Sequence, residues 1–184
     1  MSNSILAGMI LAKDRTSSFL TRLFASPMTA SDFLLGYTAP MIVMTLGQSA
    51  ITLLAACLFG LSFTVSILPA ILVTSITSLL FVGIGLLTGS LMNDKAVGGI
   101  CGALLTNAAG WLSGVFIPID LIGGAFKTIT GILPFYHGVE AVRTVLNGDY
   151  AAVLPHLAVV LGYTVVVYIL AVIAFRRKMS GDRV

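Results

Sequence analysis

Residues 33–93 decide the fold class of this chain. They read FLLGYTAPMIVMTLGQSAITLLAACLFGLSFTVSILPAILVTSITSLLFVGIGLLTGSLMN, 61 residues without a charged side chain. A helix needs only about 20 apolar residues to cross the hydrocarbon core of a bilayer, so this stretch is long enough for two crossings. We therefore predict one membrane helix over 33–58, capped by Ser31 or Asp32, and a second over 69–92 with Pro69 in its first turn.

The composition of the whole chain agrees with a lipid environment. Of the 184 residues, 58% are hydrophobic and 9% are charged, and the mean hydropathy is +1.06. The chain has too few polar groups to cover the surface of a water-soluble globular protein. Cys57 and Cys101 both fall inside apolar runs, which indicates free thiols acting as small apolar residues. We predict an all-α integral membrane protein with a single transmembrane domain over 1–184.

Two further spans and one partial helix complete the predicted bundle. Residues 96–119 and 150–175 are long uncharged runs, and the second ends at a cluster of three cations, residues 176–178. Residues 5–12 are apolar but reach only about 12 Å at 1.5 Å per residue, which indicates the end of a span. The sequence thus predicts four full transmembrane helices, a partial N-terminal one, and short interfacial or re-entrant helices over 120–149.

The positive charges predict the orientation of the bundle in the membrane. Eight of the ten Lys and Arg residues fall on one side of the predicted topology: Lys13, Arg15, Arg22, Lys95, Arg176, Arg177, Lys178 and Arg183. Only Lys127 and Arg143 fall on the other side. Cytoplasmic loops carry the excess of cations, so we predict a cell-membrane protein with a cytoplasmic C-terminus and an external segment over 120–149. Because the cations form short runs between apolar blocks, a nucleic-acid partner is not expected.

The segment 13–31 is polar at its start and then amphipathic. Phe19, Leu20, Leu23 and Phe24 recur at helical spacing, which predicts a short cytoplasmic helix. Such a helix either anchors in lipid or docks onto a soluble protein. Arg22 is the sole charge between positions 16 and 31, whereas a lipid anchor normally carries several cations, so we favour docking.

Small residues recur every four positions along the predicted third span. They are Gly98, Gly102, Thr106, Gly110 and Gly114. Ridges of this kind let the backbones of two membrane helices approach closely. The pattern predicts helix packing, either at a subunit or pathway interface or inside one bundle, and both alternatives remain open.

Few residues suggest chemistry. His137, Glu140 and Arg143 share one helical stripe, for which we favour an interfacial ion pair over a proton relay or metal site, because one His and one Glu make an incomplete zinc set. An intramembrane hydrolase or transferase using His137, Glu140 or His156 is the enzymatic alternative, but no H-E-x-x-H run supports it. Gly83, Gly85 and Gly89 do not have the spacing of a dinucleotide fingerprint.

No phosphate-binding G-x-x-x-x-G-K-[ST] motif occurs in the sequence. We therefore expect no enzyme activity and no cofactor in this chain, and any use of ATP must depend on another subunit.

Three segments resemble the membrane subunits of type-2 ABC exporters. Asp14-Arg15, followed by FLTRLFASPMT (19–29) and DFLLG (32–36), is similar to the family's coupling-helix pattern. SGVFIP (113–118) is similar to the end of its fifth helix, and PFYH (134–137) with Glu140 and Arg143 is similar to its external stretch. The resemblance covers nearly the whole chain.

The resemblance implies a permease that exports a hydrophobic, amphipathic or polymeric substrate while a separate ATP-binding cassette subunit hydrolyses ATP. It implies a second permease copy or paralogue and an external structural role for Pro134, Glu140 and Arg143. The residues expected to dock onto the ATPase are Arg15, Phe19, Leu20, Arg22, Leu23 and Phe24.

The chain also departs from the family pattern. A first helix and most of a second are missing, Asp14 stands where the pattern has Glu, and Tyr37 stands where Lys or Arg is frequent. A non-transporting membrane anchor or immunity-type subunit, or a truncated permease, is the alternative.

Overall fold

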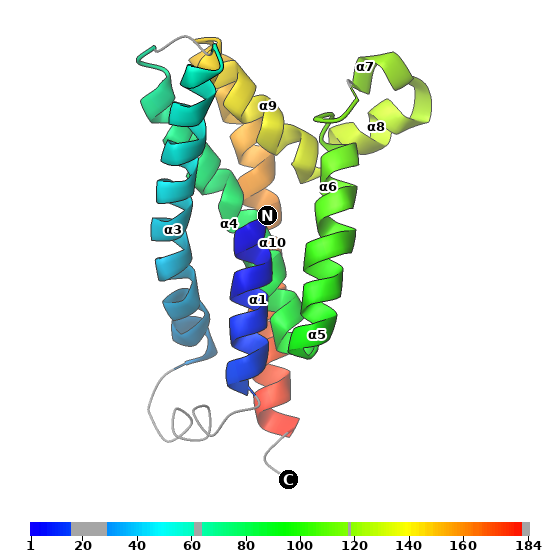
Figure 1. Cartoon of the computed structure of the whole chain (residues 1–184). Helices are drawn as coiled ribbons and strands as arrows, with labels where there is room; N and C mark the ends of the chain where they lie inside the picture. Colours follow the sequence, from blue (N-terminus) through cyan, green and yellow to red (C-terminus); the bar gives the residue numbers. More distant parts are fainter. Residues whose placement is uncertain (16–28, 61–63, 118, 182–184) are drawn as a thin grey trace.

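The computed structural model describes residues 1–15, 29–60, 64–117 and 119–181, and these residues form helices without any strand. Three helical segments are long and apolar enough to cross a membrane: α3 (Ala30–Leu58), α4 (Ile67–Leu91) and the part of α10 (Tyr150–Gly181) that ends at Arg177. They run side by side along the long axis of the molecule (Figure 1). The predicted spans over 33–58, 69–92 and 150–175 therefore fall on helices that are long and apolar enough to cross, and the chain is a membrane-embedded, multi-pass protein.

The start of α3 differs from the prediction. Its N-cap is Thr29 rather than Ser31 or Asp32, and Asp32 is the third helical residue. The Thr29 hydroxyl accepts from the backbone N–H of Asp32, while the Asp32 carboxylate accepts from the backbone N–H of Thr29 at 3.0 Å. This reciprocal capping box satisfies two N–H groups that the first turn leaves without helical partners, so α3 begins two to three residues earlier than expected.

The predicted third span, 96–119, is not one regular α-helix but a succession of three helical segments. It passes from α5 (Asp94–Val97) through the π-helix η1 (Gly98–Leu105) into α6 (Thr106–Leu112). The Thr106 hydroxyl donates to the Cys101 carbonyl five residues back, in keeping with the wider π turn. The helix ends at Leu112, and Gly114 adopts a φ of +73°. The predicted end at Ile119 is therefore wrong, and a complete crossing by this run stays a prediction.

Helix α1 (Ser2–Arg15) lies against α4, beginning at mid-height of the bundle and ending at the same end of the bundle as α10 (Figure 1). Glycines allow this close contact. A Cβ on Gly8 would lie 2.6 Å from the carbonyl oxygen of Gly85, and one on Gly89 would collide with the carbonyl oxygen of Gly8. Two helix backbones approach this closely only where side chains are absent.

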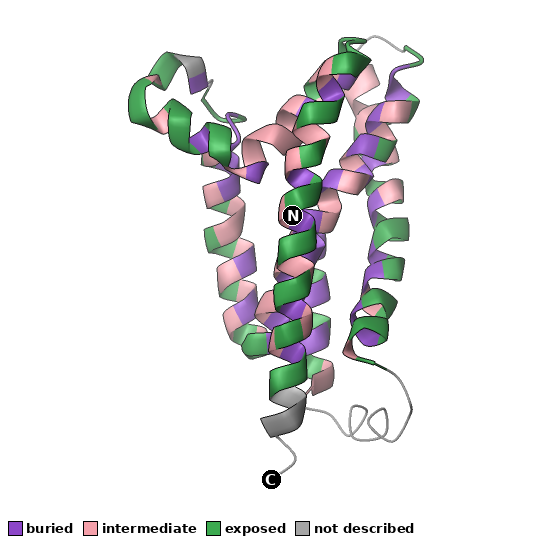
Figure 2. Ribbon diagram, turned by 180° about the vertical axis from the view of Figure 1, so that it is seen from behind, coloured by how far each residue is buried: buried purple, intermediate pink, exposed green. Residues whose placement is uncertain are grey.

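Helix α4 is the centre of the bundle. Half of the residues in its most hydrophobic window are buried, compared with 22% for α3 and 17% for α10. One core cluster joins α1, α3, α4 and α10: Ala7, Leu11, Phe33, Leu34, Met41, Val82, Leu86, Ala171 and Phe175. Exposed residues lie on the outward faces of the long helices (Figure 2), which are the faces that lipid can cover.

Three short helices follow α6: α7 (Ile119–Ile122), α8 (Gly124–Ile132) and α9 (Pro134–Leu146). They lie toward the end of the molecule that carries the connection between α3 and α4, and the α7–α8 pair projects from the bundle (Figure 1). Helix α9 packs against both α4 and α10. The helical nature of 120–149 is confirmed, whereas its place at a membrane interface stays a prediction.

Candidate functional site

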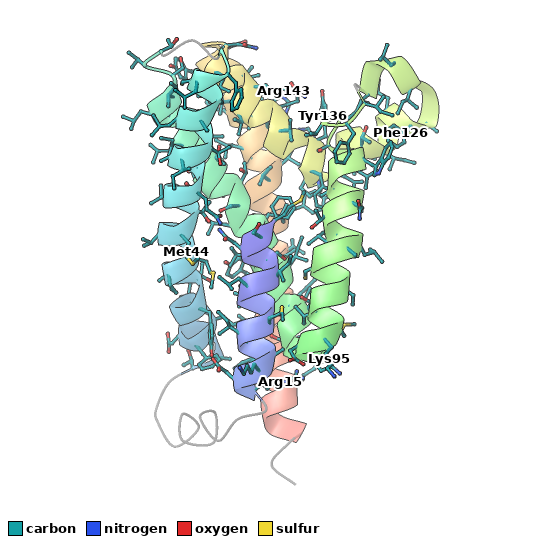
Figure 3. The ribbon with its side chains drawn as sticks, in the orientation of Figure 1. Arg15, Met44, Lys95, Phe126, Tyr136 and Arg143 are labelled. Carbon is teal, nitrogen blue, oxygen red and sulfur yellow. The ribbon has the colours of Figure 1, made fainter. Side chains whose placement is uncertain are left out.

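Arg15, expected to take part in docking, is bound to the end of another helix. It is the last residue of α1, at the end of the bundle near Lys95 (Figure 3). Its guanidinium donates to the backbone carbonyl of Ser90 and, at 3.2 Å, to that of Met92. The last carbonyls of a helix have no internal donors and carry partial negative charge, so a cation there stabilises the C-terminus of α4.

The neighbouring Asp14 is bonded to α3. The Tyr37 hydroxyl donates to the Asp14 carboxylate at 2.5 Å. These are the two positions at which the sequence departs from the residues typical of the exporter pattern. The ring of Tyr37 meets that of Phe33 edge-on at 4.9 Å, and Phe33 in turn stacks on Phe175 of α10 at 4.9 Å. The end of α1 is thus tied to α3, α4 and, through the aromatic rings, to α10.

The other predicted docking residues lie outside the described part of the chain. They are Phe19, Leu20, Arg22, Leu23 and Phe24. The docking role of this segment therefore stays a prediction, and the structure adds the anchoring of α1 and α3 on either side of it.

A cavity of about 640 Å³ lies between α3, α4, α6 and α9, next to the first residues of α1. Polar side chains of α3 and α4 line it: Thr45, Gln48, Ser49, Thr52, Thr74, Thr77 and Ser78. Apolar groups close it from α6 and α9, including Ala109, Phe135, Val139 and Val142. Arg143 is the one charged side chain among the described lining residues. The volume suits a small molecule or part of a larger one.

The hydroxyl groups of the cavity act mainly as hydrogen-bond acceptors. Thr45, Thr52 and Thr74 each donate their proton to the carbonyl four residues back in their own helix, at 2.8 Å. A hydroxyl has one proton and two lone pairs, so each oxygen still accepts. Thr45 already accepts from the Asn3 amide at 2.5 Å. The walls on α3 and α4 therefore favour water or a solute that carries N–H or O–H groups.

Two residues of the predicted stripe on α9, Glu140 and Arg143, form an ion pair. The Arg143 guanidinium donates to the Glu140 carboxylate at 2.8 Å, one helical turn away on α9. The Arg143 side chain is half-exposed and that of Glu140 is more buried. Pro134 is buried and opens α9 at a position where its missing N–H costs no helical bond. Figure 3 shows Arg143 on α9, and the structural role of these three residues stays a prediction.

His137 pairs with His156 rather than with Glu140. The Nδ1 atoms of the two rings lie 2.8 Å apart, and Nε2 of His137 lies 2.8 Å from the carbonyl oxygen of Gly131. A carbonyl only accepts, so Nε2 of His137 carries the proton, and Nδ1 of a neutral His137 accepts from His156. This chain of bonds joins α8, α9 and α10. Across the described residues, no three His, Cys, Asp or Glu side chains are grouped to hold a metal ion.

Within the described residues of this chain, no helix backbone lies on the predicted small-residue ridge, and its role at a subunit interface stays a prediction. A Cβ on Gly98 would come no closer than 3.9 Å to Met9, and one on Gly102 would lie 3.6 Å from Ile5, both at side chains of α1. Gly110 is crowded instead by the ring of Phe116. Gly114 has a positive φ that favours glycine, and Thr106 lines the cavity. The close approach occurs at Gly8, Gly85 and Gly89 instead, as described above.

Polar side chains at mid-length of apolar membrane helices are costly unless they serve a path or a partner. A cavity that they line within a multi-pass bundle is typical of membrane proteins that move a solute. The sequence comparisons define the class further. The family model described as ABC-2 type transporter matches residues 1–147, so the chain belongs to the ABC-2 type transporter family. The family consists of membrane permease components of transporters, whose ATPase activity lies in a separate subunit.

Curated relatives agree with this assignment. Nodulation protein J of Rhizobium leguminosarum bv. viciae is 28% identical over 127 residues, 68% of this chain and 49% of the relative. Nodulation protein J of Rhizobium meliloti (strain 1021) is 26% identical over 191 residues, 94% of this chain and 72% of the relative. The protein of the same name from Bradyrhizobium diazoefficiens is 26% identical, with 95% and 73% covered. The chain thus spans about half of the first relative. No solved structure matches the chain.

Proposed function

We propose that this chain is the membrane-spanning subunit of an ATP-driven ABC exporter in the cell membrane, with a cytoplasmic C-terminus. The ATP is hydrolysed by a separate ATP-binding cassette subunit, and a second permease copy or paralogue completes the pathway. The observation that carries the proposal is the hydroxyl-lined cavity between α3, α4, α6 and α9 in an otherwise apolar bundle.

The cavity also supports the class of substrate. The part of the lining on α3 presents oxygen acceptors from Thr45, Ser49 and Thr52, and the part on α9 presents the apolar surfaces of Phe135 and Val139. A solute with both polar donors and apolar parts complements such a surface better than a fully charged one does. We propose a hydrophobic, amphipathic or polymeric substrate, and the segment 13–31 as the place where the ATPase docks.

The experiment is affinity co-purification of the tagged chain from its native membrane in mild detergent, followed by mass identification of its partners. Recovery of an ATP-binding cassette subunit that is lost in Leu23→Asp and retained in Thr21→Asp supports the proposal. The two variants add the same charge to the predicted apolar and polar faces of one segment, so they form a matched pair.

If the unaltered chain is stable and no ATPase is recovered, the proposal fails. The chain is then a non-transporting anchor or immunity-type subunit, or a truncated permease that does not couple. If the ATPase is recovered equally with both variants, docking occurs elsewhere and the role of the segment 13–31 is refuted.

A further inference from the structure

Asp14 lies at the start of the predicted docking segment 13–31, at the end of α1, and Tyr37 lies just beyond the end of that segment, in the second turn of α3. Their 2.5 Å hydrogen bond, called here the α1–α3 joint, connects the two helices that the segment links. A hydrogen bond to a carboxylate is stronger than one between neutral groups, and partial burial strengthens it further. The joint therefore fixes the distance between α1 and α3, the two helices that flank the segment.

The joint is built on rigid supports. On the α1 side, Arg15 is bound to the Ser90 and Met92 carbonyls at the end of α4, and the glycine contact at Gly8 fixes α1 along α4. On the α3 side, Tyr37 packs on Phe33 and, through it, on α10. A displacement applied at the joint is therefore passed to packed helices instead of being absorbed locally.

Helices α3 and α4 carry the hydroxyl-lined walls of the cavity. The joint contacts α3 directly and α4 through α1. A change in the separation of α1 and α3 alters the relative position of these two walls. The contacts thus form a continuous physical route from the ends of the segment to the cavity.

We propose that Asp14 and Tyr37 are positioning residues that transmit ATP-driven movement of the docking segment to the cavity walls. This inference rests on the proposed function, because the movement must come from a docked ATPase. It predicts that a cation at position 37 restores the joint, whereas an apolar ring of the same shape does not.

The test measures access to the cavity in the complex of the full chain with its ATPase in liposomes. Thr52, which lines the cavity, is replaced by Cys in a Cys57→Ser, Cys101→Ser background. The probe is fluorescein maleimide, and the readout is the ratio of its labelling rates with and without ATP plus vanadate. For an intact joint, we expect this ratio to change by about fivefold or more, the usual scale of coupling between sites.

Tyr37→Phe is expected to reduce the change in labelling rate to less than about twofold while the recovered amount of ATPase is unchanged, because the donor is lost and the ring packing is kept. Tyr37→Lys should restore the nucleotide-dependent ratio, since an ammonium can pair with the Asp14 carboxylate. If Tyr37→Phe does not accumulate, Asp14→Asn, which still accepts, is compared with Asp14→Leu, which does not.

Three results overturn the inference. The first is a full nucleotide response in Tyr37→Phe or Asp14→Leu. The second is a response in Tyr37→Lys that is as low as in Tyr37→Phe. The third is an unaltered complex that binds ATPase but shows no nucleotide-dependent labelling. Failure to recover any ATPase refutes the proposed function first and the joint with it, so the two failures are distinguishable.

Discussion

The glycine contact between α1 and α4 leads to a quantitative stability prediction for Gly8→Ala. The new Cβ would lie 2.6 Å from the Gly85 carbonyl oxygen and 2.7 Å from Val97 Cγ1, whereas ordinary contact begins at 3.4 Å. The backbone oxygen cannot rotate away, so α1 must move away from α4 by about 0.8 Å. A separation of that size between packed atoms loses about a quarter to a half of the energy of each dispersion contact. Overpacking of this kind costs about 1–3 kcal/mol.

Gly47→Ala on α3 is the matched control, because nothing lies within 4 Å of its Cβ position. Both substitutions gain about 1 kcal/mol of helix propensity, so the difference between the two variants isolates the packing cost. At about 2–4 °C per kcal/mol for a chain of this length, Gly8→Ala should unfold roughly 2–12 °C below Gly47→Ala.

Thermal unfolding in mild detergent, followed by fluorescence-detected size exclusion, measures this difference. Melting temperatures of the two variants within about 1 °C of each other would refute the reasoning, because they would mean that α1 does not rest on α4 through Gly8.

Further expectations concern three other contacts. Arg15→Met should lower the free energy of unfolding by about 1–2 kcal/mol because carbonyls at the end of α4 lose their donors, and Arg15→Lys should lower it less; denaturant titration in detergent compares them. Gly114→Ala should melt below Gly131→Ala, since φ at Gly114 is +73° and an alanine there costs about 1 kcal/mol or more. His156→Phe should speed amide hydrogen exchange in α9 by roughly fivefold through loss of its bond to His137, whereas His156→Gln should speed it less, and equal rates in both would contradict the bond.

The sequence contains a pattern of polar residues that indicates the cavity, although an average of hydropathy along the chain does not detect it. Thr45, Gln48, Ser49 and Thr52 are spaced as one face of a helix, and Thr74, Thr77 and Ser78 repeat the pattern in the next span. A polar stripe in a membrane helix predicts a face turned away from lipid. The pattern does not reveal that the two stripes face the same cavity, because each is a local property of one helix.

The small-residue pattern shows the opposite case. Gly98, Gly102, Gly110 and Gly114 follow a clear four-residue repeat, yet the close backbone approach occurs at Gly85 and at its partners on α1. Within this chain, side chains of Met9 and Ile5 lie nearest to Gly98 and Gly102. A repeat of small residues therefore indicates where a backbone could approach, but it does not say which helix, of this chain or of another, lies there.

The sequence by itself determined the membrane class, the three long apolar helices and the helical nature of 120–149. Those properties depend on local hydrophobicity and on a helix rise that is nearly constant, so they can be derived from consecutive residues. Only the tertiary structure decided that Tyr37 meets Asp14, that His137 meets His156, and that Gly8 rests on Gly85. These partners are far apart in the sequence, and their meeting depends on how apolar faces of similar composition pack against one another.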